Sequence, residues 1–343
     1  MADPRPADGN PSPLLFMEAL SGYHRTAAIK AAVDLDVFTA IGSGSRTADA
    51  LAVRCGAAER GVRILADYLV VAGFLTKDSD GYGLTADSAA FLDRRSPACI
   101  ADTVTFLASP EMLDIFLHDP AAYVRHGGST AADGGTVAPE NPVWVKFARA
   151  MAPMMAMPAE LLADRLTAEA PAPRLRILDI AAGHGLFGIA LARRNPHAEI
   201  TALDWPAVLE VAAGNAAAAG LADRFDRLPG SAFDTDLGGG YDLVLLTNFL
   251  HHFDRATCVG LLRRVRAALA PGGRAAILEF APDDDRIAPP MPAMFAFTML
   301  ATTTHGDAYT CAELAAMLAA AGFARSEWHD LPPSMQRVIV GHV

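Results

Sequence analysis

Five polar residues are predicted to lie where five successive strands of the C-terminal half end: Asp179, Asp204, Ser231, His251 and Glu279. In an open α/β sheet, the carboxyl ends of the parallel strands line the ligand crevice. We therefore expect these side chains to share one edge of a sheet. Each has an ordinary structural interpretation by itself, because an aspartate can cap a helix and a lone histidine is more often structural. Their common position favours a site with chemistry.

The stretch from Leu178 to Gly188 predicts a bound nucleotide-like ligand. A short buried strand, Leu175–Leu178, precedes its glycines, and a helix, Ile189–Arg194, follows them. Glycines let the backbone turn tightly and bring N–H groups against a ligand. Asp204 follows a second strand, at roughly the distance from the glycines, about 20 residues, where an acid usually holds a ribose. These features predict an adenosine-containing cofactor.

Strands and helices alternate from Leu175 onward, which predicts an α/β fold with a parallel sheet covered on both faces. The strands after Leu175–Leu178 are expected at Glu199–Leu203, Phe225–Leu228, Tyr241–Leu246, Ala275–Leu278 and Arg337–Val340. A turn, Pro271-Gly272-Gly273, is expected before the fifth of these six strands. Helices are expected up to Gly220, up to Leu269 and over Thr310–Ala321.

The N-terminal part predicts a winged helix. Two helices are expected within Leu14–Ala40, a helix capped by Thr47 and ended by Gly56, a longer helix to Gly73, and a hairpin over Phe74–Thr85. A helix that binds DNA needs a surplus of cations. The charges on the longer helix instead sum to zero, from Glu59, Arg60, Arg63 and Asp67. We therefore interpret this part as a packing and dimerisation module.

The segment 101–166 is predicted to be helical, interrupted by loops at Gly127-Gly128 and Gly134-Gly135. Its last part carries a cluster of large apolar side chains: Phe147, Met151, Met154, Met155 and Met157. Methionines at such spacing more often fill a core than contact a ligand. Their place before the cofactor domain still makes them candidates for a substrate pocket wall. The uncharged run Ile287–Thr304 is rich in proline, so it is expected to line a pocket and not to cross a membrane.

The composition narrows the classes of partner. The chain has 343 residues, a net charge of −11 and a mean hydropathy of +0.24. An acidic protein is a poor partner for nucleic acid, whose phosphates need a basic face. Four scattered cysteines predict free thiols in a reducing cytoplasm and no zinc site. Residues 1–13 are polar and rich in proline, which is typical of a disordered tail and not of a secretory signal.

Several motifs carry a resemblance to a known family. They are Asp179 to Gly185, Leu203-Asp204-Trp205-Pro206, Leu250-His251-His252-Phe253 and Leu269-Ala270-Pro271-Gly272-Gly273. From Leu14 to Val343 the chain resembles S-adenosylmethionine-dependent O-methyltransferases of the plant caffeate/flavonoid and bacterial natural-product type. The resemblance implies a winged-helix dimerisation domain (14–100), a helical linker contributing to the substrate pocket (101–166) and a Rossmann-like class I methyltransferase domain (167–343). It also implies a homodimer that methylates a hydroxylated aromatic or related small molecule in secondary metabolism.

The resemblance also implies roles for single residues. Gly183 and Gly185 would hold the methionine part of S-adenosylmethionine, and Asp204 its ribose. His251 would be the general base, oriented by Glu279. A carboxylate bonded to the other ring nitrogen fixes the imidazole tautomer and stabilises the imidazolium that forms. The remaining residues expected at the cofactor are Asp179, Trp205, Ser231, Ala232, Phe233 and Thr247.

Three positions depart from the family pattern. Ser231 stands where an acid usually contacts adenine, His252 replaces the aspartate after the base, and Ala308 replaces a second supporting glutamate. These departures leave a C-methyltransferase, with a metal held by His251, His252 and His305 and a keto acid as substrate, as one alternative. A relative that uses S-adenosylmethionine for other chemistry is another. A cofactor sensor is disfavoured by the neutral helix, and an NAD-dependent oxidoreductase by the absence of Gly-x-Gly-x-x-Gly directly after the strand.

We expect a metal-free site in which His252 and His305 shape the acceptor pocket. The other residues expected to line this pocket are Phe147, Met151, Met154, Met155, Met294 and Met299.

Overall fold

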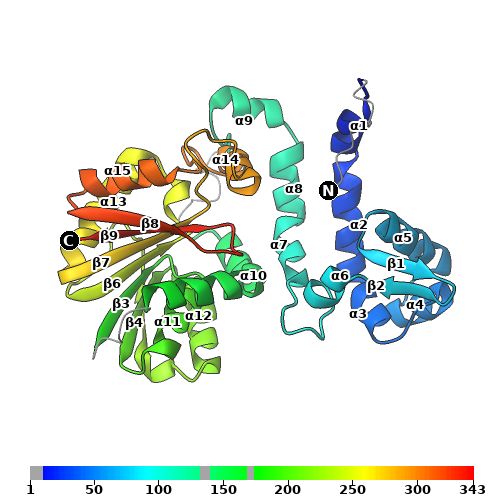
Figure 1. Ribbon diagram of the computed structural model, residues 1–343, viewed down its shortest axis with the longest axis horizontal. Coiled ribbons are helices and arrows are strands. Elements are labelled where there is room, and N and C mark those ends of the chain that lie inside the picture. Colours follow the sequence, from blue (N-terminus) through cyan, green and yellow to red (C-terminus); the bar gives the residue numbers. More distant parts are fainter. Residues whose placement is uncertain (1–10, 132–139, 168–173) are drawn as a thin grey trace. The chain divides into compact units, whose positions relative to one another are not determined.

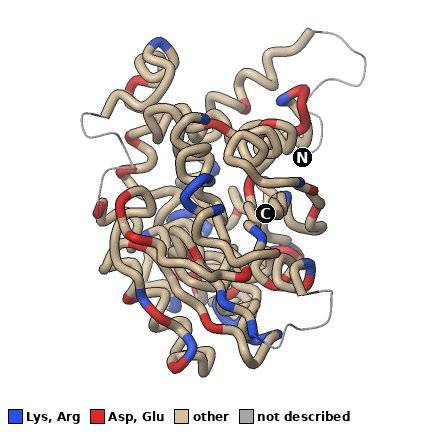
Figure 2. Tube along the Cα trace, turned by 90° about the vertical axis from the view of Figure 1, so that its left-hand side faces the viewer, with Lys and Arg blue, Asp and Glu red and all other residues tan. Residues whose placement is uncertain are grey.

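The computed structural model describes residues 11–131, 140–167 and 174–343, which divide into two compact units, 1–113 and 114–343. Most of the tail expected over residues 1–13 and the Gly134-Gly135 loop lie outside the described residues. Acidic and basic residues are interspersed along the chain (Figure 2). Within the described part, every helix is too short or too polar to cross a bilayer.

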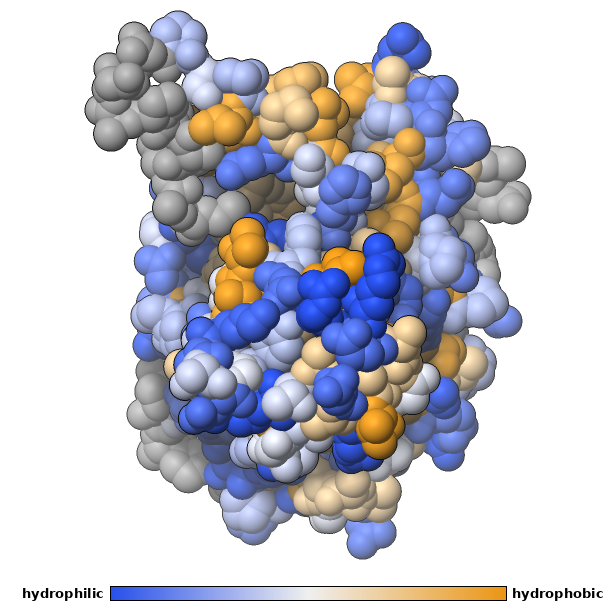
Figure 3. Space-filling view, turned by 90° about the vertical axis from the view of Figure 1, so that its right-hand side faces the viewer, coloured by the Kyte–Doolittle hydropathy of each residue, from blue (hydrophilic) through white to orange (hydrophobic). Residues whose placement is uncertain are grey.

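The first unit begins with three helices where two were predicted: α1 (Leu14–Leu20), α2 (Gly22–Asp34) and α3 (Val37–Gly42). The extra break falls at Asp36, whose φ of 57° is left-handed and cannot continue a helix. No residue of α1 is buried, although five of its seven residues are large and apolar. The face shown in Figure 3 carries separate hydrophobic patches among hydrophilic residues.

The predicted winged helix is present in this unit. Helix α4 (Ala48–Cys55) starts at Thr47, whose hydroxyl accepts from the N–H of Ala50, and ends at Gly56 with φ of 61°. Helix α5 (Glu59–Val71) buries Val62, Ala66 and Leu69. The hairpin pairs β1 (Leu75–Asp78) with β2 (Gly81–Leu84). The remaining short helices are α6 (Ala86–Phe91), η1 (Ala101–Thr103), α7 (Val104–Leu107) and α8 (Pro110–Leu117), the last of which runs across the division between the units.

The second unit is built on a seven-stranded sheet with the order β5-β4-β3-β6-β7-β9-β8. The first five strands in this order are parallel and the last two pair antiparallel. Their bounds are β3 (Leu175–Ile180), β4 (Ala198–Asp204), β5 (Phe225–Pro229), β6 (Tyr241–Thr247), β7 (Leu269–Glu279), β8 (Arg325–Asp330) and β9 (Arg337–His342). The predicted α/β fold is confirmed.

Helices cover both faces of the sheet (Figure 1). Ile177, Leu243 and Leu245 pack on one face with α10 (Val143–Leu166), α11 (Leu186–Arg194) and α12 (Pro206–Ala218). Their strand neighbours Leu178 and Val244 pack on the other face with α13 (Arg255–Ala268) and α15 (Cys311–Ala320). Each strand thus buries alternate side chains on opposite faces, as a doubly covered sheet requires. Helices α9 (Pro120–His126) and α14 (Pro290–Thr302) pack on each other.

Two strands differ from the sequence-based expectation. Strand β7 begins at Leu269, before the predicted turn, with a register shift opposite Tyr241 and Leu243. Strand β8 was missed because it lies at the sheet edge with mainly exposed polar residues, so it has no apolar alternation. The run Ile287–Thr304 was predicted to line a pocket, and residues of helix α14 within it line an open cavity. Pro290 stands in the first turn of this helix, where a missing N–H costs nothing.

Candidate active site

The loop after β3 forms a cradle of exposed backbone. Ala181, Gly183 and Gly185 all have positive φ, at 54°, 58° and 73°. A Cβ on Gly183 would meet nothing closer than the Ala181 carbonyl oxygen at 3.9 Å, whereas one on Gly185 would lie 3.1 Å from the Ala212 methyl group. The first glycine therefore leaves space for a ligand, and the second lets α12 pack close to the loop.

Asp204 is fixed beside this cradle at the end of β4. One carboxylate oxygen accepts from the N–H of Gly183 at 2.8 Å and the other from the N–H of Trp205 at 2.7 Å. Burial raises the pKa of Asp204 to about 6, against the lowering effect of these two bonds. A carboxylate has about four acceptor positions, so the two bonds leave room for ligand hydroxyls.

Asp179 is fully buried beneath the same loop. Its Oδ2 accepts from the N–H of Gly188 at 3.2 Å, while Oδ1 is buried without a partner among the described residues. Burial raises the pKa of Asp179 to about 7, the Gly188 bond opposes this rise, and the charge on Asp204 adds to it. A buried carboxyl oxygen with no donor is costly and is typical of a functional site.

The loops after β4 and β5 and the end of β6 bring the other expected cofactor residues to this edge. Ser231 follows Gly230, and its hydroxyl accepts from the N–H of Phe233 at 3.1 Å. The ring of Phe233 packs edge-on against Phe253 at 4.8 Å. Two further residues expected here, Ala232 and Thr247, are buried. Trp205 directly precedes α12, which Pro206 begins.

The residues of this edge fit S-adenosylmethionine chemically. A carboxylate with free acceptor positions suits ribose hydroxyls, and an open glycine position suits close approach of a ligand to the backbone. The unpaired oxygen of Asp179 provides an acceptor for a donor group near the loop. Their assignment as cofactor contacts stays a prediction.

His251 and Glu279 form a buried hydrogen-bonded pair at the same edge. His251 Nδ1 lies 2.5 Å from Glu279 Oε2. The other oxygen, Oε1, faces the backbone N–H groups of Phe249, Leu250 and His251 at 3.0, 2.9 and 3.4 Å. Glu279 therefore holds both the imidazole and the short η4 turn (Leu250–His252) that carries it. An ionised carboxylate only accepts, so Nδ1 carries a proton and Nε2 is left to act as the base.

Aromatic rings surround this imidazole. The ring of Phe295 lies edge-on to His251 at 4.9 Å, and that of His252 lies 4.2 Å away. His252 Nδ1 faces the Phe249 carbonyl oxygen at 3.1 Å, and burial, aided by the nearby His251, lowers the pKa of His252 well below its usual value. Trp144 of α10 stands edge-on to His252 at 5.3 Å. The residue that replaces the family aspartate is thus a neutral ring.

The expected pocket residues on α10 and α14 differ in how deeply they are buried. Phe147 packs against Trp144, and Met151, Met155 and Met299 are buried. Met155 and the partly buried Met154 belong to the hydrophobic core under the sheet. Met294 is largely exposed. The core interpretation therefore holds for part of the methionine cluster.

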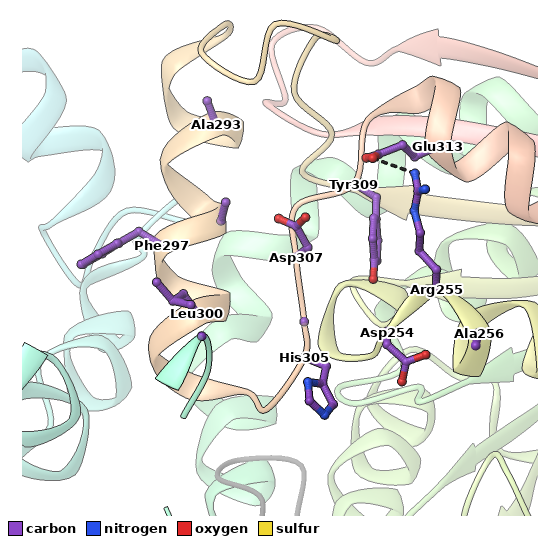
Figure 4. Close-up of a pocket in the computed structure, with 13 residues that line it drawn as sticks. Asp254, Arg255, Ala256, Ala293, Phe297, Leu300, His305, Asp307, Tyr309 and Glu313 are labelled. Carbon is purple, nitrogen blue, oxygen red and sulfur yellow. Dashed lines mark ion pairs between the residues drawn. The ribbon is translucent and has the colours of Figure 1, made fainter. Parts of the chain in front are cut away.

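The sequence predicts that His305, with His252, shapes the acceptor pocket, and this role stays a prediction. The side chain of His305 lines an open cavity of about 1020 Å³, together with Asp254, Arg255 and one face of α14 (Figure 4). The next residue, Gly306, packs against the His251 carbonyl oxygen. Within residues 11–131, 140–167 and 174–343, no three His, Cys, Asp or Glu side chains are placed to hold a metal. The three-imidazole arrangement behind the C-methylation alternative does not form.

Sequence reasoning missed four residues at this edge: Trp144, Asn248, Phe295 and Gln336. Gln336 directly precedes β9. Because β9 is antiparallel, its beginning and not its end lies at the ligand edge, so a search of strand ends passes over it. Asn248 was detectable, since it directly follows β6.

Comparison with known proteins establishes the family. Residues 137–324 match the O-methyltransferase domain and residues 17–94 match the O-methyltransferase dimerisation domain. The chain therefore belongs to the O-methyltransferase family, and its dimerisation domain makes it a homodimer. The predicted family, enzyme class and fold are confirmed.

Three known proteins are similar to this chain over nearly its whole length. A Nostoc punctiforme protein provisionally assigned as an O-methyltransferase is 52% identical, with a TM-score of 0.94 over 97% of this chain and 100% of that one. The 3-hydroxy-5-methyl-1-naphthoate 3-O-methyltransferase of Streptomyces sahachiroi is 29% identical over 316 residues, which is 90% of this chain and 89% of the relative. Human N-acetylserotonin methyltransferase, solved with S-adenosylmethionine, shares the fold at 21% identity, with a TM-score of 0.84 over 98% and 99% of the chains.

Proposed function

We propose that this chain transfers a methyl group from S-adenosylmethionine to a hydroxyl group of an aromatic small molecule, with His251 as the general base. The observation that carries the proposal is the buried His251–Glu279 pair, which leaves one imidazole nitrogen free at the edge that also holds Asp204. The naphthoate relative acts on a ring hydroxyl, which supports the choice of acceptor class.

Separate residues would bind the cofactor and remove the proton from the acceptor. Asp204 would accept from the ribose hydroxyls, and the Gly183 loop would lie against the amino acid part of the cofactor. When bound, S-adenosylmethionine supplies a methyl group that its positively charged sulfur has already activated. His251 Nε2 would take the proton of the acceptor hydroxyl, and Glu279 would stabilise the imidazolium that results.

The aromatic surroundings of His251 fit a planar acceptor. Phe295 and His252 lie within about 5 Å of the His251 ring, and Trp144 packs edge-on against His252; aromatic pairs favour such offset or edge-on contacts. Because His252 is neutral, it places no negative charge beside the acceptor. Alignment of the acceptor oxygen with the methyl group is expected to supply much of the rate increase.

We also propose that the protein works in the cytoplasm. All four cysteines are free, and two of them, Cys258 and Cys311, are buried. Unpaired thiols are typical of a reducing compartment.

Mass spectrometry of products tests the proposed reaction. The protein would be incubated with S-adenosylmethionine and a panel of phenols, hydroxybenzoates and hydroxynaphthoates. The matched controls are their methyl ethers, which keep the ring and lack the free hydroxyl. We expect methylated product from at least one hydroxylated compound and none from its ether. Methylation of the ethers, or a product whose new methyl group is on carbon, would contradict the proposal.

A further inference from the structure

Hydrogen bonds hold the η4 turn, which carries His251, from two directions. Glu279, at the end of β7, faces the backbone N–H groups of the turn. The carbonyl side of the turn meets the loop between α14 and α15. There the His251 carbonyl oxygen accepts from the N–H of Asp307 at 2.9 Å. The carbonyl oxygen of Phe253, which ends the turn, accepts from the hydroxyl of Tyr309 at 2.6 Å.

The segment 305–309 of this loop lies directly against the turn. A Cβ on Gly306 would overlap the His251 carbonyl oxygen, so this close approach requires glycine. The N–H of Gly306 donates to the hydroxyl of Thr303 at 2.8 Å, which ties the start of the segment to the end of α14. Directly after the segment, Thr310 caps α15 with its hydroxyl. The segment is therefore anchored at both ends and can fix the turn in place.

The Tyr309 hydroxyl is a dependable donor to the turn. Tyr309 is only 5% exposed, and its hydroxyl oxygen points toward the segment before Asp254 (Figure 4). Burial is the main reason that the pKa of Tyr309 lies above its usual value, so the hydroxyl keeps its proton. The thiol of Cys258 also faces the Phe253 carbonyl, at 3.8 Å, but a thiol is a weak donor. Without the hydroxyl, this carbonyl would keep only that weak partner.

The far side of the segment borders open space. His305, Asp307 and Tyr309 line the cavity of about 1020 Å³ (Figure 4). Packed side chains resist movement, whereas an open cavity does not. The hydrogen bonds from the segment therefore contribute more to the position of the η4 turn than they would inside a packed core.

We infer that Tyr309 is a positioning residue for the base His251: its hydroxyl, through the Phe253 carbonyl, holds the η4 turn so that the imidazole stays aligned with the acceptor hydroxyl. The inference rests on the proposed function, because it requires His251 to be the base. Proton transfer depends on hydrogen-bond geometry, and a misplacement of about 1 Å can cost about a hundredfold in rate. Tyr309 would act through the turn and not on the acceptor itself.

Steady-state kinetics of two matched tyrosine variants test the inference. Tyr309→Phe removes the hydroxyl and keeps the ring. Tyr82→Phe is the control, because Tyr82 is also buried and its hydroxyl donates to Asp67 at 2.8 Å, in the first unit. With an acceptor from the product screen, we expect kcat of Tyr309→Phe to fall by about five- to tenfold, the upper range for one net hydrogen bond. The acceptor KM and the S-adenosylhomocysteine affinity should stay within about twofold of wild type.

The control separates positioning from a purely structural role. Both variants lose one buried hydrogen bond, so both should melt at a lower temperature, but Tyr82→Phe should keep the kcat of wild type. A folded Tyr309→Phe protein with wild-type kcat would overturn the inference. A loss of S-adenosylhomocysteine affinity equal to the loss of kcat would also overturn it, since Tyr309 would then not act on the base.

A double-mutant cycle with the base shows whether Tyr309 acts through it. In the His251→Ala protein, whose residual product is followed by mass spectrometry over long incubations, adding Tyr309→Phe should cause no further loss. The same five- to tenfold loss, about one net hydrogen bond, in that background would overturn the inference. Absence of O-methylated product from the wild-type protein, or full turnover in His251→Ala alone, would instead overturn the proposed function.

Discussion

The cofactor half of the site, formed by the loop after β3 and Asp204, differs from the acceptor half around His251 in what holds it in shape. In the cofactor half, backbone groups make the contacts: Asp204 accepts from two backbone N–H groups, and Gly183 has a left-handed backbone. In the acceptor half, side chains from separate elements meet: Trp144 from α10, His252 from η4 and Phe295 from α14. Changes in one half should therefore leave the other half largely intact.

After replacement of His251 itself, the largest loss of turnover is expected from Glu279→Gln, which disturbs only the acceptor half. Glutamine offers one oxygen, so either His251 Nδ1–H or the three backbone N–H groups of η4 would face its NH₂ group. We expect turnover to fall by about two orders of magnitude, as in other enzymes that lose the residue orienting the base. Calorimetry should show S-adenosylhomocysteine affinity within about threefold of wild type. Equal loss of affinity would mean that the two halves are not separable.

Asp204→Ala breaks the cofactor half alone. Removing the charged acceptor for the ribose hydroxyls costs about 1.5–3 kcal/mol, so S-adenosylhomocysteine binding should weaken by at least about tenfold. Asp204→Asn keeps the shape and one acceptor oxygen and should lose less. Circular dichroism provides the folding control. Wild-type affinity in a folded Asp204→Ala protein would exclude this residue from the site.

Substitutions on helix α1 should leave both halves of the site intact. Helix α1 exposes Leu14, Leu15, Phe16, Met17 and Leu20 by 50–64% each, and large apolar surfaces of this kind favour association. We expect Phe16→Asp combined with Leu20→Asp to yield monomers by light scattering at micromolar concentration. Val53→Asp, on an equally apolar but separate exposed position, should remain dimeric. A dimeric double variant would place the interface elsewhere in residues 17–94.

The pH dependence of stability sharpens the comparison within the cofactor half. The pKa of Asp179 is about 7 in the folded protein and near 3.9 in an unfolded chain. The folded state thus holds a proton that the unfolded state has released, and this contribution to stability is lost as the pH rises from about 4 through 7.

Asp179→Asn removes this loss, so the ligand-free variant should melt higher than wild type at pH 8. The gain should be about 2–4 °C for each kcal/mol recovered, and it should shrink at pH 5. The measurement is the melting temperature of both proteins at the two pH values. A gain that is the same at both would show that Asp179 does not titrate in this range.

The sequence predicts some residues of each half and misses others. Asp204 and Glu279 were predicted because each ends a parallel strand, and the geometry of a parallel sheet converts that position into a shared edge. Gln336 was not, because the direction of β9 cannot be read from its apolar residues. Within the described residues the three-imidazole alternative does not form, because the path of the loop that carries His305 depends on the packing of Gly306 against His251, which leaves no local sequence pattern. Positions that follow from strand order can be predicted from the sequence, and positions that depend on the packing of distant segments cannot.

The most direct test of the account is His251→Ala, measured for turnover and for cofactor affinity in the same preparation. With an acceptor found in the product screen, we expect turnover to fall by about two to four orders of magnitude, the usual contribution of a general base. S-adenosylhomocysteine should bind as it does to wild type, because His251 makes none of the contacts of the cofactor cradle. Turnover close to wild type in this variant would contradict the assignment of His251 as the base.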